Sequence, residues 1–200
     1  ALFYLIKKQK FEEITIRAMP TADGSAYALQ FDLKAFWTFR KLKFKGIFVG
    51  KDQFRQLYLM EYGERFDERR HEDSLKKIID SLHRDGYFLV ELGVELIRDE
   101  QTKSITVQIN LHKGPRFFVE TVDVEVKSTL PDRQEIEGLR EMVCEHFKKR
   151  LAKNYYIREL INTETQELQM LLAHHGYLHV DITPEERLSP MCRQVALHFT

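Results

Sequence analysis

The sequence predicts an α+β fold built from tandem small units, each a three-stranded sheet covered by two helices on one face. The main observation is a junction that occurs twice, as "HRDGYFLVELGVEL" at 83–96 and as "AHHGYLHVDITPEE" at 173–186. In both copies an apolar helical pattern reaches Gly-Tyr and then changes to alternating apolar residues. Periods of 3.6 and 2 residues are typical of helices and strands. Because glycine often ends a helix, each copy indicates a helix followed by a strand.

Residues upstream of the glycine support this alignment. Ile78 and Leu82 are four residues apart, as Leu168 and Leu172 are in the second copy. Side chains at that spacing lie on one face of a helix. The repeated unit therefore contains an amphipathic helix before the glycine.

Further elements complete the unit in the middle of the chain. The first is a strand in "FRKLKFKGIF" (39–48), which is followed by a helix around Phe54, Leu57 and Tyr58 that stops near Gly63. A second helix starts with Asp67 as its N-cap. After it come two alternating strands, 88–98 and 105–111, on either side of the polar turn "DEQTKS". Such alternation bounded by a polar turn is the usual sign of a hairpin. The unit is therefore strand, helix, helix, strand, strand.

The end of the chain repeats this order. A strand is predicted in "FFVETVDVEV" (117–126), a helix at 132–151, a strand at 178–182, a polar loop in "PEERLSPMCR" and a last strand at 195–199. Near the start, Leu5 and Phe11 keep the interval of Leu82 and Phe88, and two alternating strands surround the turn "PTADGS". We therefore predict the C-terminal part of one domain at 1–37 and complete domains at 38–115 and 116–200.

Composition narrows the function classes. The chain has 31 basic and 31 acidic residues, whereas nucleic-acid-binding proteins usually carry an excess of Lys and Arg. The densest basic segment is "RKLKFK" (40–45), which we interpret as the solvated face of a strand, with an anion-binding patch as the alternative. Cys144 and Cys192 are 48 residues apart in no metal-binding or redox motif, and the sequence leaves their pairing open.

No residue pattern predicts catalysis, a cofactor or a metal site. His174 and His175 are adjacent near a helix end and point apart, and His179 begins the next predicted strand. Zinc needs three or four converging ligands. The sequence also lacks the Gly-x-Ser-x-Gly and phosphate-loop motifs. We therefore expect a protein that is not an enzyme.

Gly-Tyr-Phe at the end of the second helix and "INLHKGP" at 109–115 carry a resemblance to a known family. With a βααββ unit of this size, they resemble a POTRA (polypeptide-transport-associated) domain. The similarity is closest over 38–126, looser over 116–200, and limited to a domain tail in 1–37. The glycine usual after the first strand of the family fits Gly46, but Lys127 and Ser128 stand there in the last repeat.

The resemblance implies a location and a role. POTRA domains stand in the periplasm ahead of an outer-membrane β-barrel, where they receive, guide or fold other proteins. It therefore implies a periplasmic scaffold in a Gram-negative bacterium or derived organelle, with a barrel outside these 200 residues. Its partners would be extended or unfolded outer-membrane or secreted polypeptides and accessory assembly proteins.

The predicted binding site is an edge strand. The resemblance implies that the second strand of each unit lies at the sheet edge, where unpaired backbone groups can add a guest strand. The predicted partner-binding residues are Phe88, Val90, Glu91, Leu92, Gly93, Val94, Glu95, Leu96, Leu178, Val180 and Ile182. Gly114 and Pro115 form the predicted interdomain hinge. The alternative function is a nucleic-acid-binding α/β module, which would need a Gly-x-x-Gly clamp or a basic face.

Overall fold

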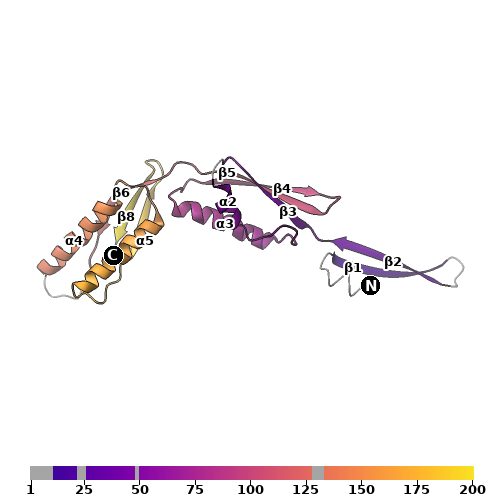
Figure 1. Ribbon diagram of the computed structural model, residues 1–200, viewed down its shortest axis with the longest axis horizontal. Helices are drawn as coiled ribbons and strands as arrows, with labels where there is room; N and C mark the ends of the chain where they lie inside the picture. Colours follow the sequence, from indigo (N-terminus) through magenta and orange to yellow (C-terminus); the bar gives the residue numbers. More distant parts are fainter. Residues whose placement is uncertain (1–10, 22–25, 48–49, 128–132) are drawn as a thin grey trace. The chain divides into compact units, whose positions relative to one another are not determined.

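The structure is a computed structural model (Figure 1). It describes residues 11–21, 26–47, 50–127 and 133–200. Leu5 and the tip of the turn "PTADGS", on which two of the expectations above fall, lie outside the described residues, as does Ser128. No described helix has the length and apolar character needed to cross a membrane.

The chain divides into two compact units. The first unit comprises Ala1–Lys76 and Leu92–Leu111, and the second comprises Lys77–Glu91 and His112–Thr200. We keep the names middle repeat for 38–115 and last repeat for 116–200 when equivalent residues are compared.

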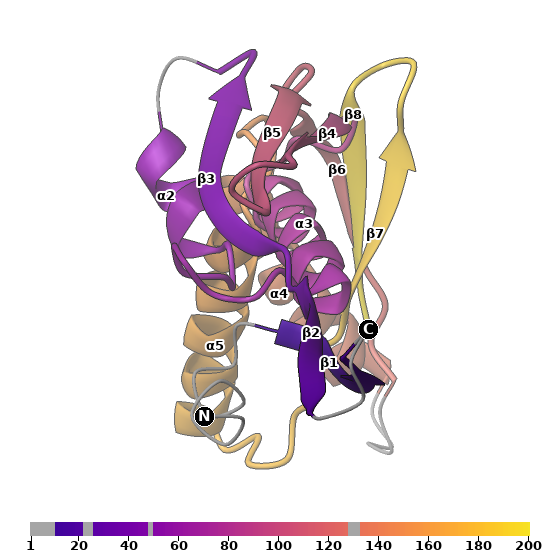
Figure 2. The same cartoon turned by 90° about the vertical axis from the view of Figure 1, so that its right-hand side faces the viewer.

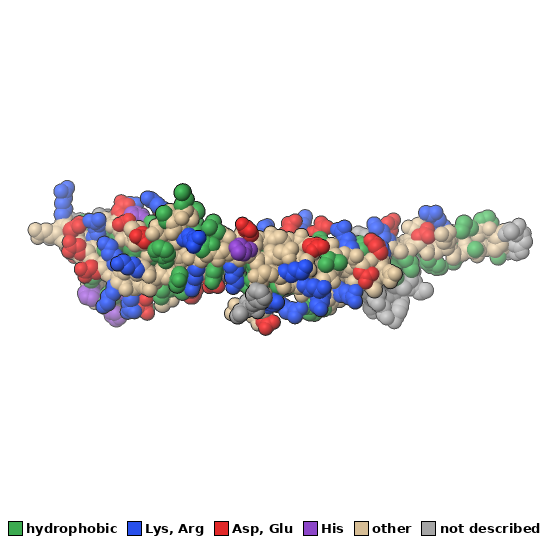
Figure 3. All heavy atoms as spheres, turned by 90° about the horizontal axis from the view of Figure 1, so that it is seen from above, with side chains coloured by type: hydrophobic (Ala, Val, Ile, Leu, Met, Phe, Trp, Pro, Cys, Tyr) green, Lys and Arg blue, Asp and Glu red, His purple; other side chains and the backbone are tan. Residues whose placement is uncertain are grey.

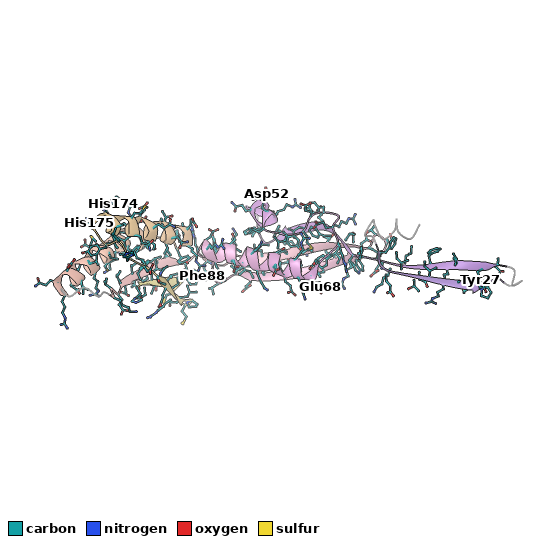
Figure 4. All side chains as sticks on the ribbon, turned by 90° about the horizontal axis from the view of Figure 1, so that it is seen from below. Tyr27, Asp52, Glu68, Phe88, His174 and His175 are labelled. Carbon is teal, nitrogen blue, oxygen red and sulfur yellow. The ribbon has the colours of Figure 1, made fainter. Side chains whose placement is uncertain are left out.

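Strands β1 (Phe11–Pro20) and β2 (Tyr27–Ala35) form an antiparallel hairpin in the first unit. Its regular register runs from Glu13 opposite Lys34 to Pro20 opposite Tyr27. Large apolar side chains of both strands are exposed, and Tyr27 is the most exposed of them (Figure 4).

The middle repeat follows in the predicted order. Its elements are β3 (Thr38–Lys45), α2 (Lys51–Gln56), α3 (Glu68–Arg84), β4 (Glu91–Asp99) and β5 (Ser104–His112). The three strands form one sheet in the order β3-β5-β4, with β3 parallel to β5. Helix α2 and the N-terminal half of α3 lie on one side of this sheet (Figure 2).

Apolar side chains that alternate along the strands form the core of the first unit. Strand β5 is buried along one face through Ile105, Val107, Ile109 and Leu111. On β3 the core side chains are Phe39 and Leu42, which are interrupted by a bulge at Arg40. Central strands lose most of their apolar surface to neighbours on both sides, and each fully buried side chain of this size stabilises the fold by about 1.5–3 kcal/mol.

Helix α3 begins as predicted. The Asp67 carboxylate accepts a hydrogen bond from the Arg70 backbone N–H at 3.1 Å, which is the bond of an N-cap. Below it, the Tyr58 hydroxyl lies 2.7 Å from His71 Nδ1, and the Ser74 hydroxyl accepts a bond from the Leu59 N–H at 2.9 Å. These bonds satisfy polar groups that the packing has removed from water.

The last repeat has the same order of elements in the second unit. They are β6 (Phe118–Val124), α4 (Arg133–Leu151), α5 (Arg158–His174), β7 (Pro184–Ser189) and β8 (Gln194–Phe199). The sheet order is β6-β8-β7, with β6 parallel and β7 antiparallel to β8. Its core includes a stacked pair, Phe147 and Phe199, with ring centroids 3.8 Å apart.

The predicted α+β fold class is confirmed. Both repeats show strand, helix, helix, strand, strand, and each has a three-stranded sheet. Helices α3 and α5 start and end ninety positions apart in the numbering, as Glu68–Arg84 and Arg158–His174. The repeated Gly-Tyr junction of the sequence is thus the end of the second helix in each repeat.

Candidate polypeptide-binding edges

The second strand of each repeat is an outer strand of its sheet. The sheet orders place β4 beside β5 only and β7 beside β8 only. An outer strand has one row of backbone N–H and C=O groups without a partner in the sheet, so it can pair with another extended chain. Both strands are therefore candidate edges for a guest polypeptide.

Strand β4 combines a backbone edge with partly uncovered apolar side chains. Leu92 and Leu96 are half-buried, and Val94 is 38% exposed, whereas Val107 and Ile109 of the neighbouring strand are fully buried. The difference arises because an outer strand has a neighbour on one side only. A guest strand would cover this apolar surface while it pairs with the backbone.

Side chains in the middle and at the C-terminal end of β4 contact the other two strands of the sheet. The Gln108 amide donates to the Glu95 carboxylate at 2.6 Å, and Arg40 is 3.2 Å from Asp99. Asp99 also accepts hydrogen bonds from the Gln101 and Thr102 backbone at 3.1 and 3.3 Å. Hydrogen bonds from Thr102 lower the pKa of Asp99, and the bond from the Thr102 side chain has a larger effect than the bond from its backbone. The turn after β4 is therefore built around an ionised carboxylate.

Strand β7 is shorter and more polar. The Glu186 carboxylate accepts a hydrogen bond from the buried Tyr156 hydroxyl and lies 3.0 Å from Arg158. Burial, followed by the bond to Glu186, raises the pKa of Tyr156. Leu188 is its exposed large apolar residue. The Glu186 cluster ties the outer strand to the start of α5, so this edge is less free to accept apolar contacts than β4.

Some of the predicted partner-binding residues lie in an outer strand and others do not. Glu91, Leu92, Gly93, Val94, Glu95 and Leu96 lie in β4, as expected for the middle repeat. Phe88 and Val90 precede the strand. Leu178, Val180 and Ile182 lie outside any strand, because β7 begins at Pro184, and this part of the strand assignment was wrong.

The reason for the error is physical. Val180 and Ile182 alternate because they pack against the core of the last repeat from a segment that belongs to no described strand. Strand β7 reads "PEERLS", whose one large apolar residue is Leu188, so no apolar alternation marks it. The ninety-residue offset between the helices, applied to β4, maps it onto 181–189 and would have located β7.

Phe88 has a packing role. Its ring centroid lies 5.3 Å from that of Phe117 and 5.0 Å from that of Tyr156, both at steep edge-on angles. Beside it the Phe117 N–H donates to the Gly86 carbonyl at 2.9 Å. Phe88 is therefore covered within the second unit and is not available on an edge. We call this contact the aromatic corner, formed by Gly86, Phe88, Phe117 and Tyr156.

Two glycines allow the backbones to approach here. A Cβ on Gly86 would lie 2.6 Å from the Tyr156 carbonyl oxygen, and a Cβ on Gly114 would lie 2.6 Å from the Leu89 carbonyl oxygen. Both residues also have positive φ, at 86° and 69°. Gly114, of the predicted hinge, thus stands in close contact with the chain before β4, and its hinge role stays a prediction.

Histidine and cysteine side chains are spread over the last repeat. His174 and His175 lie at the end of α5 (Figure 4), and His175 Nδ1 is 2.8 Å from the Leu171 carbonyl. Cys144 and Cys192 are free thiols. Within the described residues, no three His, Cys, Asp or Glu side chains are placed to hold one metal ion.

Solved structures identify the fold. No protein-family model matches the sequence, and no curated protein is similar to it in sequence. POTRA domains 3–5 of BamA from Haemophilus influenzae match with a TM-score of 0.51 at 12% identity, over 96% of this chain and 73% of that one.

A second match agrees with the first. BamA from Haemophilus ducreyi lacking POTRA domains 1–3 matches with a TM-score of 0.51 at 11% identity, over 82% of this chain. The chain spans only 29% of that protein. At these identities the likeness shows the fold, and it agrees with the βααββ order of both repeats. The chain has the fold of POTRA domains, as the resemblance in its sequence predicted.

Proposed function

We propose that this chain is a periplasmic scaffold of an outer-membrane protein assembly or secretion machine, which holds client polypeptides or accessory proteins by adding them as strands. The observation that carries the proposal is the free edge of β4 in a sheet with the POTRA fold. The matching BamA structures support it by analogy of fold. The proposed domains are a domain tail at 1–37 and two complete domains at 38–115 and 116–200.

Backbone pairing suits a scaffold with many clients. Hydrogen bonds to an edge strand supply affinity without requiring a particular side-chain sequence. Each bond contributes about 0.5–1.5 kcal/mol net, so about six bonds contribute roughly 3–9 kcal/mol. Association itself costs at least about 4 kcal/mol. Binding is therefore weak and reversible, as release of a client requires.

Strand β4 is the principal edge in this proposal. It has nine residues, against six in β7, and it adds the partly exposed side chains of Leu92, Val94 and Leu96. A Cβ on Gly93 would lie 3.8 Å from the Asn110 Cβ, an ordinary contact distance, so no close backbone approach requires glycine at this position. We expect a guest strand to lie along Glu91–Asp99.

Proline substitution tests this edge. N–H groups of adjacent strand residues point to opposite sides, so of Val94→Pro and Glu95→Pro one removes an outward N–H and the other a bond to β5. Thermal unfolding identifies the variant that keeps its stability. That variant should bind a labelled extended peptide of alternating Val and Thr at least about threefold more weakly than the unmodified chain, because about one hydrogen bond is lost.

Ala18→Pro is the matched control, because it places a proline in β1, an exposed strand that does not belong to the sheet of β4. Fluorescence anisotropy of the same peptide gives the affinities. Equal affinity for the unmodified chain and both β4 variants would contradict the edge proposal.

Cell fractionation tests the location. The full-length protein, detected with an antibody to this chain, should be found in the outer-membrane fraction. Recovery of the whole protein in the cytosol would contradict the periplasmic part of the proposal and leave the edge proposal to the binding experiment.

A further inference from the structure

Strand β3 is the second outer strand of the middle sheet, on the side opposite β4. The start of its outer side is covered, because the Phe39 N–H donates to the Glu64 carbonyl and the Gly63 N–H donates to the Phe39 carbonyl, both at 2.8 Å. From Lys41 to Lys45 no described segment pairs with this outer side. Half of β3 is therefore a free backbone edge.

Three lysines follow this free edge at alternate positions. Lys41, Lys43 and Lys45 are exposed, whereas Leu42 between them is buried. Alternate residues of a strand share one face and stand about 6.6–6.8 Å apart. Across the sheet the three lysines lie opposite Thr106, Gln108 and Asn110 in turn, which carry no charge. No acidic side chain among the described residues forms an ion pair with them.

Helix α2 adds two more cations beside the edge. Lys51 and Arg55 line one groove with residues 41–45 of β3, with a volume of about 430 Å³. Among the described residues that line this groove, Asp52 of α2 (labelled in Figure 4) is the one with an acidic side chain. Basic side chains also gather over this part of the molecule in the space-filling view (Figure 3). We call this surface the basic groove.

The fold does not require these charges. Strand β6 occupies the same place in the last repeat, with Asp123 at the position of Lys43, and Glu125, directly after the strand, at the position of Lys45. The apolar positions between them stay apolar in both strands. The lysines are therefore free surface residues of β3 rather than a condition of its folding.

We propose that the basic groove binds an acidic, extended polypeptide segment, which adds to β3 as a fourth strand. Asp or Glu at positions i, i+2 and i+4 of the guest would face Lys41, Lys43 and Lys45, because both strands have the same side-chain spacing. Opposite charges directly across two strands stabilise the pair. The free backbone edge favours a polypeptide over a lipid headgroup, which cannot pair with it. This edge is separate from β4 and β7, so its test is independent of theirs.

A labelled ten-residue peptide in which Glu alternates with Thr is the probe, used with the whole chain. Its affinity, measured by fluorescence anisotropy, should fall about tenfold or more in the variant Lys41→Glu, Lys43→Glu, Lys45→Glu. It should also fall severalfold between about 50 and about 300 mM salt, because exposed charges are screened. The matched control, Lys76→Glu, Lys77→Glu, Lys148→Glu, changes net charge equally on exposed helical positions and should bind within about twofold of the unmodified chain.

Two further probes separate the alternatives. The same peptide with N-methyl groups on alternate backbone nitrogens keeps its charges but cannot pair, so it should bind much more weakly. Equal binding of the N-methylated peptide, equal losses in the two triple variants, or no binding of the peptide by the unmodified chain would each overturn the proposal. Binding to vesicles that contain phosphatidylglycerol, without binding to the peptide, would overturn it in favour of a lipid surface.

Discussion

Strands β3 and β6 begin their repeats in the same way but carry opposite charges. Lys43 and Lys45 of β3 correspond to Asp123 of β6 and to Glu125, which directly follows it. The buried positions, by contrast, are apolar in both strands. Packing restricts the residues that face the core, whereas residues that face water can differ without changing the fold. If the two repeats bind different partners, we therefore expect the cause to lie in the residues that face water.

The second helices differ inside the core as well. Ser74 of α3 and Glu164 of α5 stand at equivalent positions, and both are buried. Ser74 bonds only to backbone groups, whereas the Glu164 carboxylate lies 3.3 Å from His146 and 3.8 Å from Arg150. The last repeat therefore buries a carboxyl group beside two basic side chains of α4, whereas the middle repeat has a serine hydroxyl at this position.

The largest expected effect comes from exchanging this pair. Ser74→Glu would bury a carboxylate in place of a hydroxyl whose partners are backbone groups, so we expect a loss of about 3–5 kcal/mol in the free energy of unfolding. Urea denaturation measures it. Lys77→Glu places the same side chain on the exposed side of α3 and should change stability by less than about 0.5 kcal/mol. Similar stability for the two variants would show that the middle repeat accepts a buried charge.

The Gly-Tyr junctions give the next effect. Gly86→Ala would cost about 1–3 kcal/mol more than Gly176→Ala, because only the Cβ at 86 meets another backbone. Both glycines have positive φ, so the conformational strain cancels in the comparison. Thermal unfolding of the two variants measures the difference. Equal losses would mean that the aromatic corner yields to the added methyl group.

A smaller effect is expected at Tyr156. Tyr156→Phe removes the hydroxyl that donates to Glu186, while Arg158 still neutralises that carboxylate. We expect a loss of about 0.5–1.5 kcal/mol in the free energy of unfolding. Tyr155→Phe, which removes an exposed hydroxyl from the adjacent residue, is the control and should change little. An unchanged Tyr156→Phe variant would show that the Glu186 cluster does not stabilise β7.

The smallest effect concerns pH and the middle repeat alone. Burial, opposed in part by the Glu72 and Glu68 carboxylates, lowers the pKa of His71. The unfolded chain therefore binds the proton more readily, so stability is full above the unfolded histidine pKa of about 6.5 and falls as the pH drops below it. His71→Gln should flatten the dependence of unfolding free energy on pH between about 7 and about 5. If His71→Gln left the dependence of stability on pH unchanged, other titrating groups would be responsible for that dependence.

Local patterns predicted much of this molecule. The alternation of Ile105, Val107 and Ile109 located β5, and Asp67 was correctly predicted as the N-cap of α3. Strand β7 was missed because its sequence, "PEERLS", is mostly polar and has no apolar period. Phe88 was assigned to a strand because it continues the alternation of β4, although contacts with Phe117 and Tyr156 decide its place.

The order of elements in each repeat followed from the sequence alone, because helix ends and strand alternation are set by residues a few positions apart. The tertiary structure alone decided three other features. They are the order of the strands in each sheet, the outer side of β3 at Lys41, Lys43 and Lys45 with which no described segment pairs, and the packing that covers Phe88. Those features depend on which residues meet across long separations in the chain. The apolar period along one strand indicates which of its side chains face the core, but it does not indicate whether a second strand lies beside it.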